Sequence, residues 1–128
     1  MRTPNHLYLK MDPDERLAAG AGGAVRCLAD AAGLPDEAIL QFQASVVSAC
    51  KRCFGAQSPD KFCEIMLDRL QDRIQVEVTV SECKSPQEKD KLAWPGVDEV
   101  RCEPRDDSTV LRLTKFLSSD NSRWPNVP

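Results

Sequence analysis

The order of helix-like and strand-like segments predicts an α+β domain, an antiparallel or mixed sheet with helices packed on one face. Two long stretches with apolar residues at helical spacing occupy positions 14–32 and 35–54. Segments in which apolar and polar residues alternate follow in the second half of the chain and are arranged in pairs. A chain of 128 residues can build one hydrophobic core but not two, so we expect a single domain over 1–117 and a polar tail over 118–128.

The first third of the chain predicts a short strand followed by two helices. Residues 7–11 alternate, which places Leu7, Leu9 and Met11 on one side of a strand. The first helix begins after Asp12-Pro13 and ends at Gly33. Its expected core stripe comprises Leu17, Ala21, Ala24, Val25, Leu28 and Ala32, interrupted by three glycines that weaken the helix or allow close packing against a sheet.

The second helix begins near Pro35, has two acidic residues in its first turn, and ends at Gly55. Its expected apolar face is supplied by Ile39, Leu40, Phe42, Val46, Val47, Cys50 and Phe54.

The second half of the chain predicts two hairpins separated by a short helix. Residues 74–80 form the clearest strand, because β-branched residues alternate with polar ones. The stretch before it also fits a helix, but a turn at Asp72-Arg73 favours an antiparallel partner strand. The expected elements are a strand at 62–69, a strand at 74–80, a helix at 86–93 opened by a capping box, and strands at 97–102 and 109–116.

Composition excludes several classes of function. The chain has 17 Lys and Arg against 20 Asp and Glu, so its net charge of -3 gives no general attraction to nucleic acid or anionic lipid. His6 is the single histidine, which argues against a Ser-His-Asp triad and against a multi-histidine metal site. The first residues lack the apolar core of a signal peptide, and no apolar run is long enough to span a membrane, so we expect a cytoplasmic protein.

Six cysteines are present, and we interpret them mainly as buried structural thiols in a reducing compartment. Cys50 and Cys53 form a C-x-x-C pair inside the second helix. A zinc site would need a second close pair, and the other cysteines are scattered singly. A metal site or a thiol-based sensor that uses Cys50 and Cys53 remains an alternative.

Several segments, taken in the order in which they follow each other along the chain, resemble the bacterial anti-sigma-factor serine kinases of the histidine-kinase-like (GHKL or Bergerat) ATPase superfamily. The resemblance covers about residues 7–117, and it is strongest at Ala44-Ser45-Val46-Val47-Ser48-Ala49-Cys50-Lys51-Arg52-Cys53-Phe54, which is similar to the helix bearing the family's N-box. Other similar pieces are Leu7-Tyr8-Leu9, Asp12-Pro13-Asp14-Glu15-Arg16-Leu17, residues 31–38, the central hairpin at 72–79, and the closing hairpin at 96–100 and 108–115. It implies a Bergerat-like sandwich of sheet and helices.

This sequence departs from the family pattern at the residues that handle nucleotide. The family N-box reads Glu-x-x-x-Asn, in which Glu acts as the base and Asn holds magnesium; the corresponding positions here are Ser48 and Arg52. A serine hydroxyl is no general base at neutral pH, and Arg places a fixed positive charge where the cation would sit. The adenine-reading Asp-x-Gly is replaced by Val80-Ser81-Glu82. The glycine-rich ATP lid is missing, because only 14 residues separate Glu82 from Val97.

These departures predict a degenerate nucleotide site with no catalytic residue, no metal and no cofactor. The expected function is that of a pseudokinase, an anti-sigma-factor-like regulator that binds proteins in a bacterial partner-switching pathway. The resemblance implies a sigma factor, a small anti-sigma antagonist or a second copy as partner, bound through about Glu15–Arg26 and the flanks of Ser48–Phe54. The alternative is an active ATP-dependent serine kinase with an atypical site, using ATP and Mg²⁺.

Two further features of the sequence have alternative interpretations. Trp94 fits either an exposed anchor for a partner or an aromatic residue that caps the core. Lys51, Arg52, Lys61, Arg69 and Arg73 could gather into a basic patch, although a solvated face is the preferred interpretation.

Overall fold

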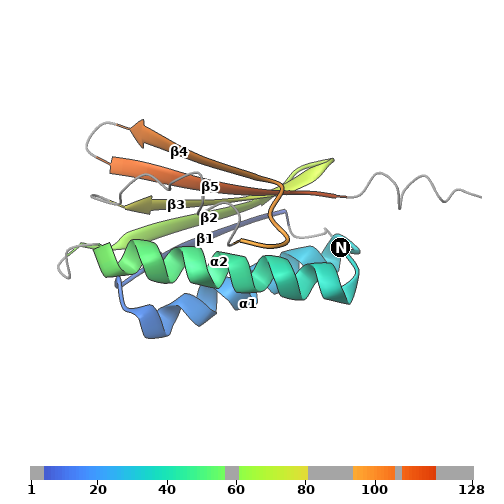
Figure 1. The fold of residues 1–128 in the computed structure, drawn as a ribbon, viewed down its shortest axis with the longest axis horizontal. Helices are drawn as coiled ribbons and strands as arrows, with labels where there is room; N and C mark the ends of the chain where they lie inside the picture. Colours follow the sequence, from blue (N-terminus) through green and yellow to red (C-terminus); the bar gives the residue numbers. More distant parts are fainter. Residues whose placement is uncertain (1–4, 57–60, 81–93, 106–107, 118–128) are drawn as a thin grey trace, which may run out of the picture.

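A five-stranded antiparallel sheet forms one layer of the molecule, and two helices form the other (Figure 1). The computed structural model describes residues 5–56, 61–80, 94–105 and 108–117. Within these residues the elements are β1 (His6–Met11), a 3₁₀ turn (Glu15–Leu17), α1 (Ala18–Ala31), α2 (Asp36–Ala56), β2 (Cys63–Arg69), β3 (Arg73–Val80), β4 (Glu99–Arg105) and β5 (Ser108–Phe116).

The strand order is β1-β2-β3-β5-β4, and every neighbouring pair is antiparallel. The expected α+β architecture, with the helices on one face of the sheet, is therefore confirmed. The alternation along β3 has its predicted effect, because Ile74, Val76, Val78 and Val80 are buried against the helices. In β1, Leu7, Leu9 and Met11 share one face and pack against the core.

The core lies between α1, α2 and the inner face of the sheet. α2 contributes its largest buried side chains, Phe42 and Phe54, and α1 contributes Val25 and Leu28. The predicted helical stripes were wrong at two leucines. Leu17 is 42% exposed because it belongs to the 3₁₀ turn and not to α1, and Leu40 is 54% exposed because it lies on the outer side of α2.

The two helices approach each other closely at Gly22. A Cβ atom on Gly22 would lie 2.5 Å from Cγ2 of Val47 on α2. The expectation that the glycines of α1 pack against the sheet is therefore wrong for Gly22, whose close neighbour is α2. Gly20 and Gly23 face open space.

Element boundaries differ from the predicted ones by a few residues. α2 continues through Gly55 to Ala56, so Gly55 does not end it. β4 begins at Glu99 instead of position 97 and extends through Pro104 to Arg105. The predicted helix at 86–93, Ser81, Glu82, Cys83 and the tail at 118–128 lie outside the described residues. No helix in the described part of the chain is long and apolar enough to cross a membrane.

Candidate functional site

One face of α2 carries the residues at the positions that resemble the N-box. Gln41, Ser45, Ser48 and Arg52 follow each other at spacings of three and four residues, so they form one stripe along the helix. Ser48 and Arg52, in the C-terminal half of the helix, are exposed. Ser45 is only 2% exposed, although it is polar.

Ser45 is buried because the segment Trp94–Gly96 crosses α2 at this point. The hydroxyl of Ser45 donates a hydrogen bond to the carbonyl oxygen of Pro95, with 2.6 Å between the two oxygens. Trp94 is 5% exposed and belongs to the core. Of the two expectations for Trp94, the core-capping aromatic is therefore right and the exposed anchor is wrong.

Gly96 brings the backbone of this segment into direct contact with α2. A Cβ atom on Gly96 would lie 2.7 Å from Cβ of Gln41 and 2.9 Å from the backbone nitrogen of Phe42. Its φ of +82° lies in the left-handed region, where glycine is favoured. The segment therefore covers the N-terminal half of the stripe, at Gln41 and Ser45. Ser48 and Arg52 form the C-terminal half of the stripe, beyond this contact.

The side chains on the stripe do not fit magnesium-ATP. Ser48 offers a single neutral hydroxyl oxygen, and Arg52 has no oxygen ligand and carries a permanent positive charge that repels a magnesium ion. Val80, at the end of β3, is 2% exposed and has an apolar side chain that cannot accept a hydrogen bond from an adenine amino group. Glu82 lies outside the described residues.

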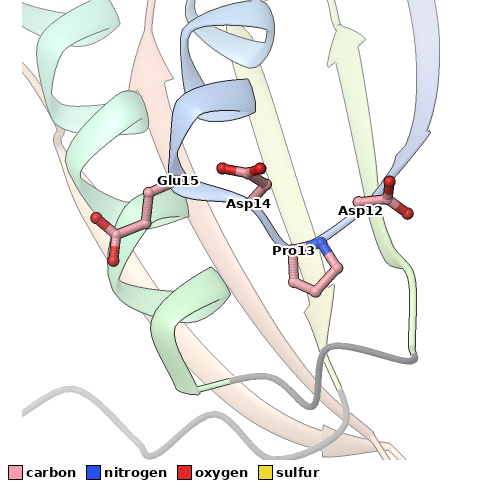
Figure 2. A pocket seen from close by; sticks show the side chains of 4 residues that line it. All are labelled: Asp12, Pro13, Asp14 and Glu15. Atoms are coloured by element: carbon pink, nitrogen blue, oxygen red, sulfur yellow. The ribbon is translucent and has the colours of Figure 1, made fainter.

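An acidic pocket of about 580 Å³ lies where β1 leads into the 3₁₀ turn, and it is lined by Asp12, Pro13, Asp14 and Glu15. Figure 2 shows the three carboxylates pointing in separate directions. The Arg16 guanidinium donates to Asp14, with 2.6 Å from Nη2 to Oδ2, and these hydrogen bonds lower the pKa of Asp14 to about 2. Asp14 is thus already neutralised within the chain, and no three metal-binding side chains in the described ranges are placed to hold an ion.

The cysteines of α2 are buried thiols. Cys50, Cys53 and Cys63 are buried, whereas Cys27 is exposed. Burial, with a smaller contribution from Cys63, raises the pKa of Cys50 from 9.0 to about 12. Because the thiolate is the reactive form, Cys50 is a poor nucleophile at neutral pH, which argues against the thiol-sensor alternative.

The basic residues do not gather into one patch. Lys61 precedes β2, whereas Arg69 and Arg73 lie at the opposite end of the β2–β3 hairpin. Arg73 is paired with Asp72, with 2.9 Å between Nε and Oδ1. The preferred interpretation as solvated side chains is consistent with this separation.

The contact between Gly96 and α2 was not predicted from the sequence. A bulky residue cannot replace a glycine with positive φ, so this glycine was the available signal. Its partner, Ser45, lies 50 residues before Pro95 and has no local pattern that marks it.

The fold is shared with a solved structure of known proteins. The crystal structure of the RsbU and RsbW domains of Rv1364c from Mycobacterium tuberculosis matches 88% of this chain with a TM-score of 0.71 and 13% sequence identity. The present chain spans 33% of that chain's length. No protein-family model and no curated protein sequence matches. The expected Bergerat-like architecture thus has a solved counterpart, and at this identity the likeness concerns the fold alone.

Proposed function

We propose that the chain is an anti-sigma-factor-like regulator that acts by binding other proteins and does not use nucleotide. The observation that carries this proposal is the set of groups that lie on the α2 stripe. Trp94–Gly96 covers one half of it, and Ser48 and Arg52 occupy the other half. A fixed positive charge and a hydroxyl at these positions supply neither a general base nor a metal ligand set.

The fold supports the regulatory half of the proposal. An RsbW domain is part of the solved structure with the same fold, and the sequence resembles anti-sigma-factor kinases over most of its length. The partner is then a sigma factor, a small antagonist of anti-sigma factors, or a second copy of the chain, in a bacterial cytoplasm. The expected contact regions are Glu15–Arg26 and the flanks of Ser48–Phe54.

α1 presents a suitable outer surface for such a partner. Ala19, Gly20 and Gly23 are exposed on the side away from the core, and a Cβ atom on either glycine would meet nothing within 4 Å. A partner backbone can approach a helix closely where side chains are this small. Arg26 adds one positive charge beside them.

The test is direct binding of purified proteins from the same genome. The immobilised protein is exposed to each sigma factor and each small antagonist, with and without Mg²⁺-ATP, and γ-phosphate transfer from labelled ATP is measured in parallel. We expect one of these partners to bind with an affinity that nucleotide does not change, and no labelled partner. Phosphate transfer would instead establish the kinase alternative, and binding to none of them would overturn the proposal.

Two matched variants locate the contact. Gly23→Arg places a bulky side chain on the outer face of α1 and favours the helix, so the fold should persist while binding is lost. Arg101→Ala changes an exposed residue of β4 on the far face of the sheet and should bind like the unmodified protein. Equal binding by both variants would remove α1 from the contact.

A further inference from the structure

The two helices of the described residues cover one face of the sheet and leave the other face open (Figure 1). Side chains alternate along a strand, and those of Ile65 and Leu67 point into the core, so Met66 between them points to the opposite, outer face. Tyr8 lies on the same face, because both of its neighbours in β1 pack against the core. The register of β1 with β2 pairs Tyr8 with Met66, so the two side chains are adjacent.

Phe62 extends this apolar surface at the start of β2. The ammonium group of Lys10, which belongs to the outer face of β1, lies 4.8 Å from the centre of the Phe62 ring. Tyr8, Phe62 and Met66 are 50%, 55% and 37% exposed, and we call these three residues the outer patch. Large apolar side chains that gather on an open face mark a surface on which another segment binds.

A negative charge beside the outer patch has no ion pair. Glu64 accepts a hydrogen bond from the hydroxyl of Tyr8 at 2.9 Å, and no basic side chain in the described ranges lies within salt-bridge distance of it. Lys10 lies opposite Glu64 in the register, but its ammonium group is placed over Phe62. The outer patch therefore suits a segment that brings an apolar anchor and a cation next to it.

The C-terminal segment of the chain has this chemistry in its sequence. Residues 118–128 lie outside the described residues, and they contain Arg123 directly before Trp124, followed by Pro125 and Pro128. Segments rich in proline dock on surfaces lined by aromatic side chains. A tryptophan ring also makes favourable contacts with a methionine sulfur and with other aromatic rings. The outer patch supplies both kinds of group, and an arginine can pair with the carboxylate beside it.

The segment is long enough to reach the outer patch from the end of β5. Phe116 lies opposite Arg73, whereas Met66 lies opposite Glu77, so Met66 is two strands across and four residues along from Phe116. These steps correspond to a straight distance of about 17 Å. Trp124 follows Phe116 by eight residues, which span about 26 Å when they are extended. The chain between them can therefore cross the outer face with length to spare.

We propose that residues 123–128 dock on the outer patch of the same molecule, with Trp124 against Met66 and Tyr8 and with Arg123 beside Glu64. A short tether holds the segment near the patch at a millimolar effective concentration, which favours it over a separate partner of the same chemistry. The docked segment covers the open face of the sheet and leaves the outer surface of both helices uncovered. The proposal is independent of the proposed function.

Oxidation of Met66 by hydrogen peroxide, followed by peptide mapping, tests the proposal on the full chain. A covered methionine is oxidised more slowly than an exposed one, so Trp124→Ala should oxidise Met66 about threefold faster or more than the unmodified protein. Trp124→Phe keeps an aromatic anchor and should protect Met66 better than Trp124→Ala does. Met11, which packs against the core, is the internal reference and should react at one rate in all three proteins. Equal oxidation of Met66 in Trp124→Ala and the unmodified protein would overturn the proposal.

Acrylamide quenching of Trp124 fluorescence tests the same contact from the other side. Subtracting the emission of Trp124→Phe removes the contribution of Trp94. Trp124 should be shielded in the unmodified protein, and Met66→Asp should make it as accessible as in the urea-unfolded chain. Arg101→Asp, on β4 at the far side of the outer face, is the matched control and should leave the shielding unchanged. Shielding that is lost on dilution, or that Met66→Asp leaves intact, would contradict docking on the patch of the same molecule.

Discussion

At the scale of single residues, Gly96 and Ser45 hold a distant segment against α2. Gly96 provides a positive φ and an absent side chain, and Ser45 provides the hydrogen bond to Pro95. Together they hold the segment Trp94–Gly96 over the N-terminal half of the α2 stripe, which is the helix face that resembles the N-box face of the family.

Replacing Gly96 tests how firmly this segment is held. Gly96→Ala should lower the free energy of unfolding by at least about 2 kcal/mol, because the new Cβ meets backbone atoms and alanine disfavours positive φ. Gly23→Ala is the matched control, and it should raise the free energy by about 0.5–1 kcal/mol because its Cβ meets open space in a helix. Urea unfolding measures both. If the two variants are equally stable, Gly96 is not in tight contact with α2.

Cys50 allows a second test at this scale. In alkylation at pH 8, Cys27 should react quickly and Cys50 only on unfolding, because burial raises its pKa to about 12. At pH 7 a thiol with this pKa is ionised in on the order of one molecule in 10⁵. Peptide mapping by mass spectrometry identifies the modified residue, and rapid labelling of Cys50 in the native protein would revive the thiol-sensor alternative.

The raised pKa of Cys50 also makes the stability of the protein depend on pH, with a definite sign. The native pKa of Cys50 lies above its ordinary value of 9.0, so the unfolded chain releases this proton more readily than the native protein. Its contribution to stability is complete below about pH 9 and is lost as the pH rises towards 12. Cys50→Ala should therefore lose less stability than the unmodified protein between these limits.

At the scale of elements, the contact between α1 and α2 depends on the absence of a side chain at Gly22. The helix propensity of alanine would favour Gly22→Ala, but the Cβ would lie within 2.5 Å of Val47. The steric overlap with Val47 outweighs the gain in helix propensity, because packed interiors tolerate little added volume.

A double-mutant cycle measures this contact. Gly22→Ala should destabilise the protein by about 1 kcal/mol or more through overpacking. Val47→Ala removes the obstructing methyl groups, so the double variant should be more stable than the sum of the two single effects predicts. Strictly additive effects in urea unfolding would show that the two residues do not meet.

The elements that the sequence predicted well were those with a clear local period. β3 and β2 were predicted to within about a residue because apolar side chains alternate along both, and α2 was predicted from its apolar face. Leu17 was misplaced because periodicity does not show where a helix begins, and Leu40 was misplaced because it lies on the outer side of α2 although it is apolar. β4 was displaced because charged residues and Pro104 obscure its alternation.

At the scale of the whole molecule, the fold was predicted from the order of the segments, whereas the role of Ser48 and Arg52 rests on the family resemblance and stays a prediction. The arrangement of the site was not predicted, because it depends on a contact between α2 and a segment 50 residues further along the chain. Gly96 was a local signal of this contact, but no pattern around Ser45 marks the place on α2 that it meets. The Trp94 alternatives could therefore be decided only by its burial.

The proposed function treats the fold and the nucleotide chemistry as separable in this molecule. The sheet and both helices persist around a packed core, while the exposed end of the α2 stripe carries a hydroxyl and a guanidinium group. We infer that this fold acts by presenting surfaces to which other proteins bind.

Thermal unfolding in the presence of magnesium and ATP tests this central claim most directly. A ligand that binds only the native state raises the melting temperature, and by a larger amount at concentrations far above its dissociation constant. We predict the same melting temperature in millimolar Mg²⁺-ATP as in Mg²⁺ alone. A reproducible rise of several degrees that ATP produces and inorganic triphosphate does not would contradict the claim that the nucleotide site is lost.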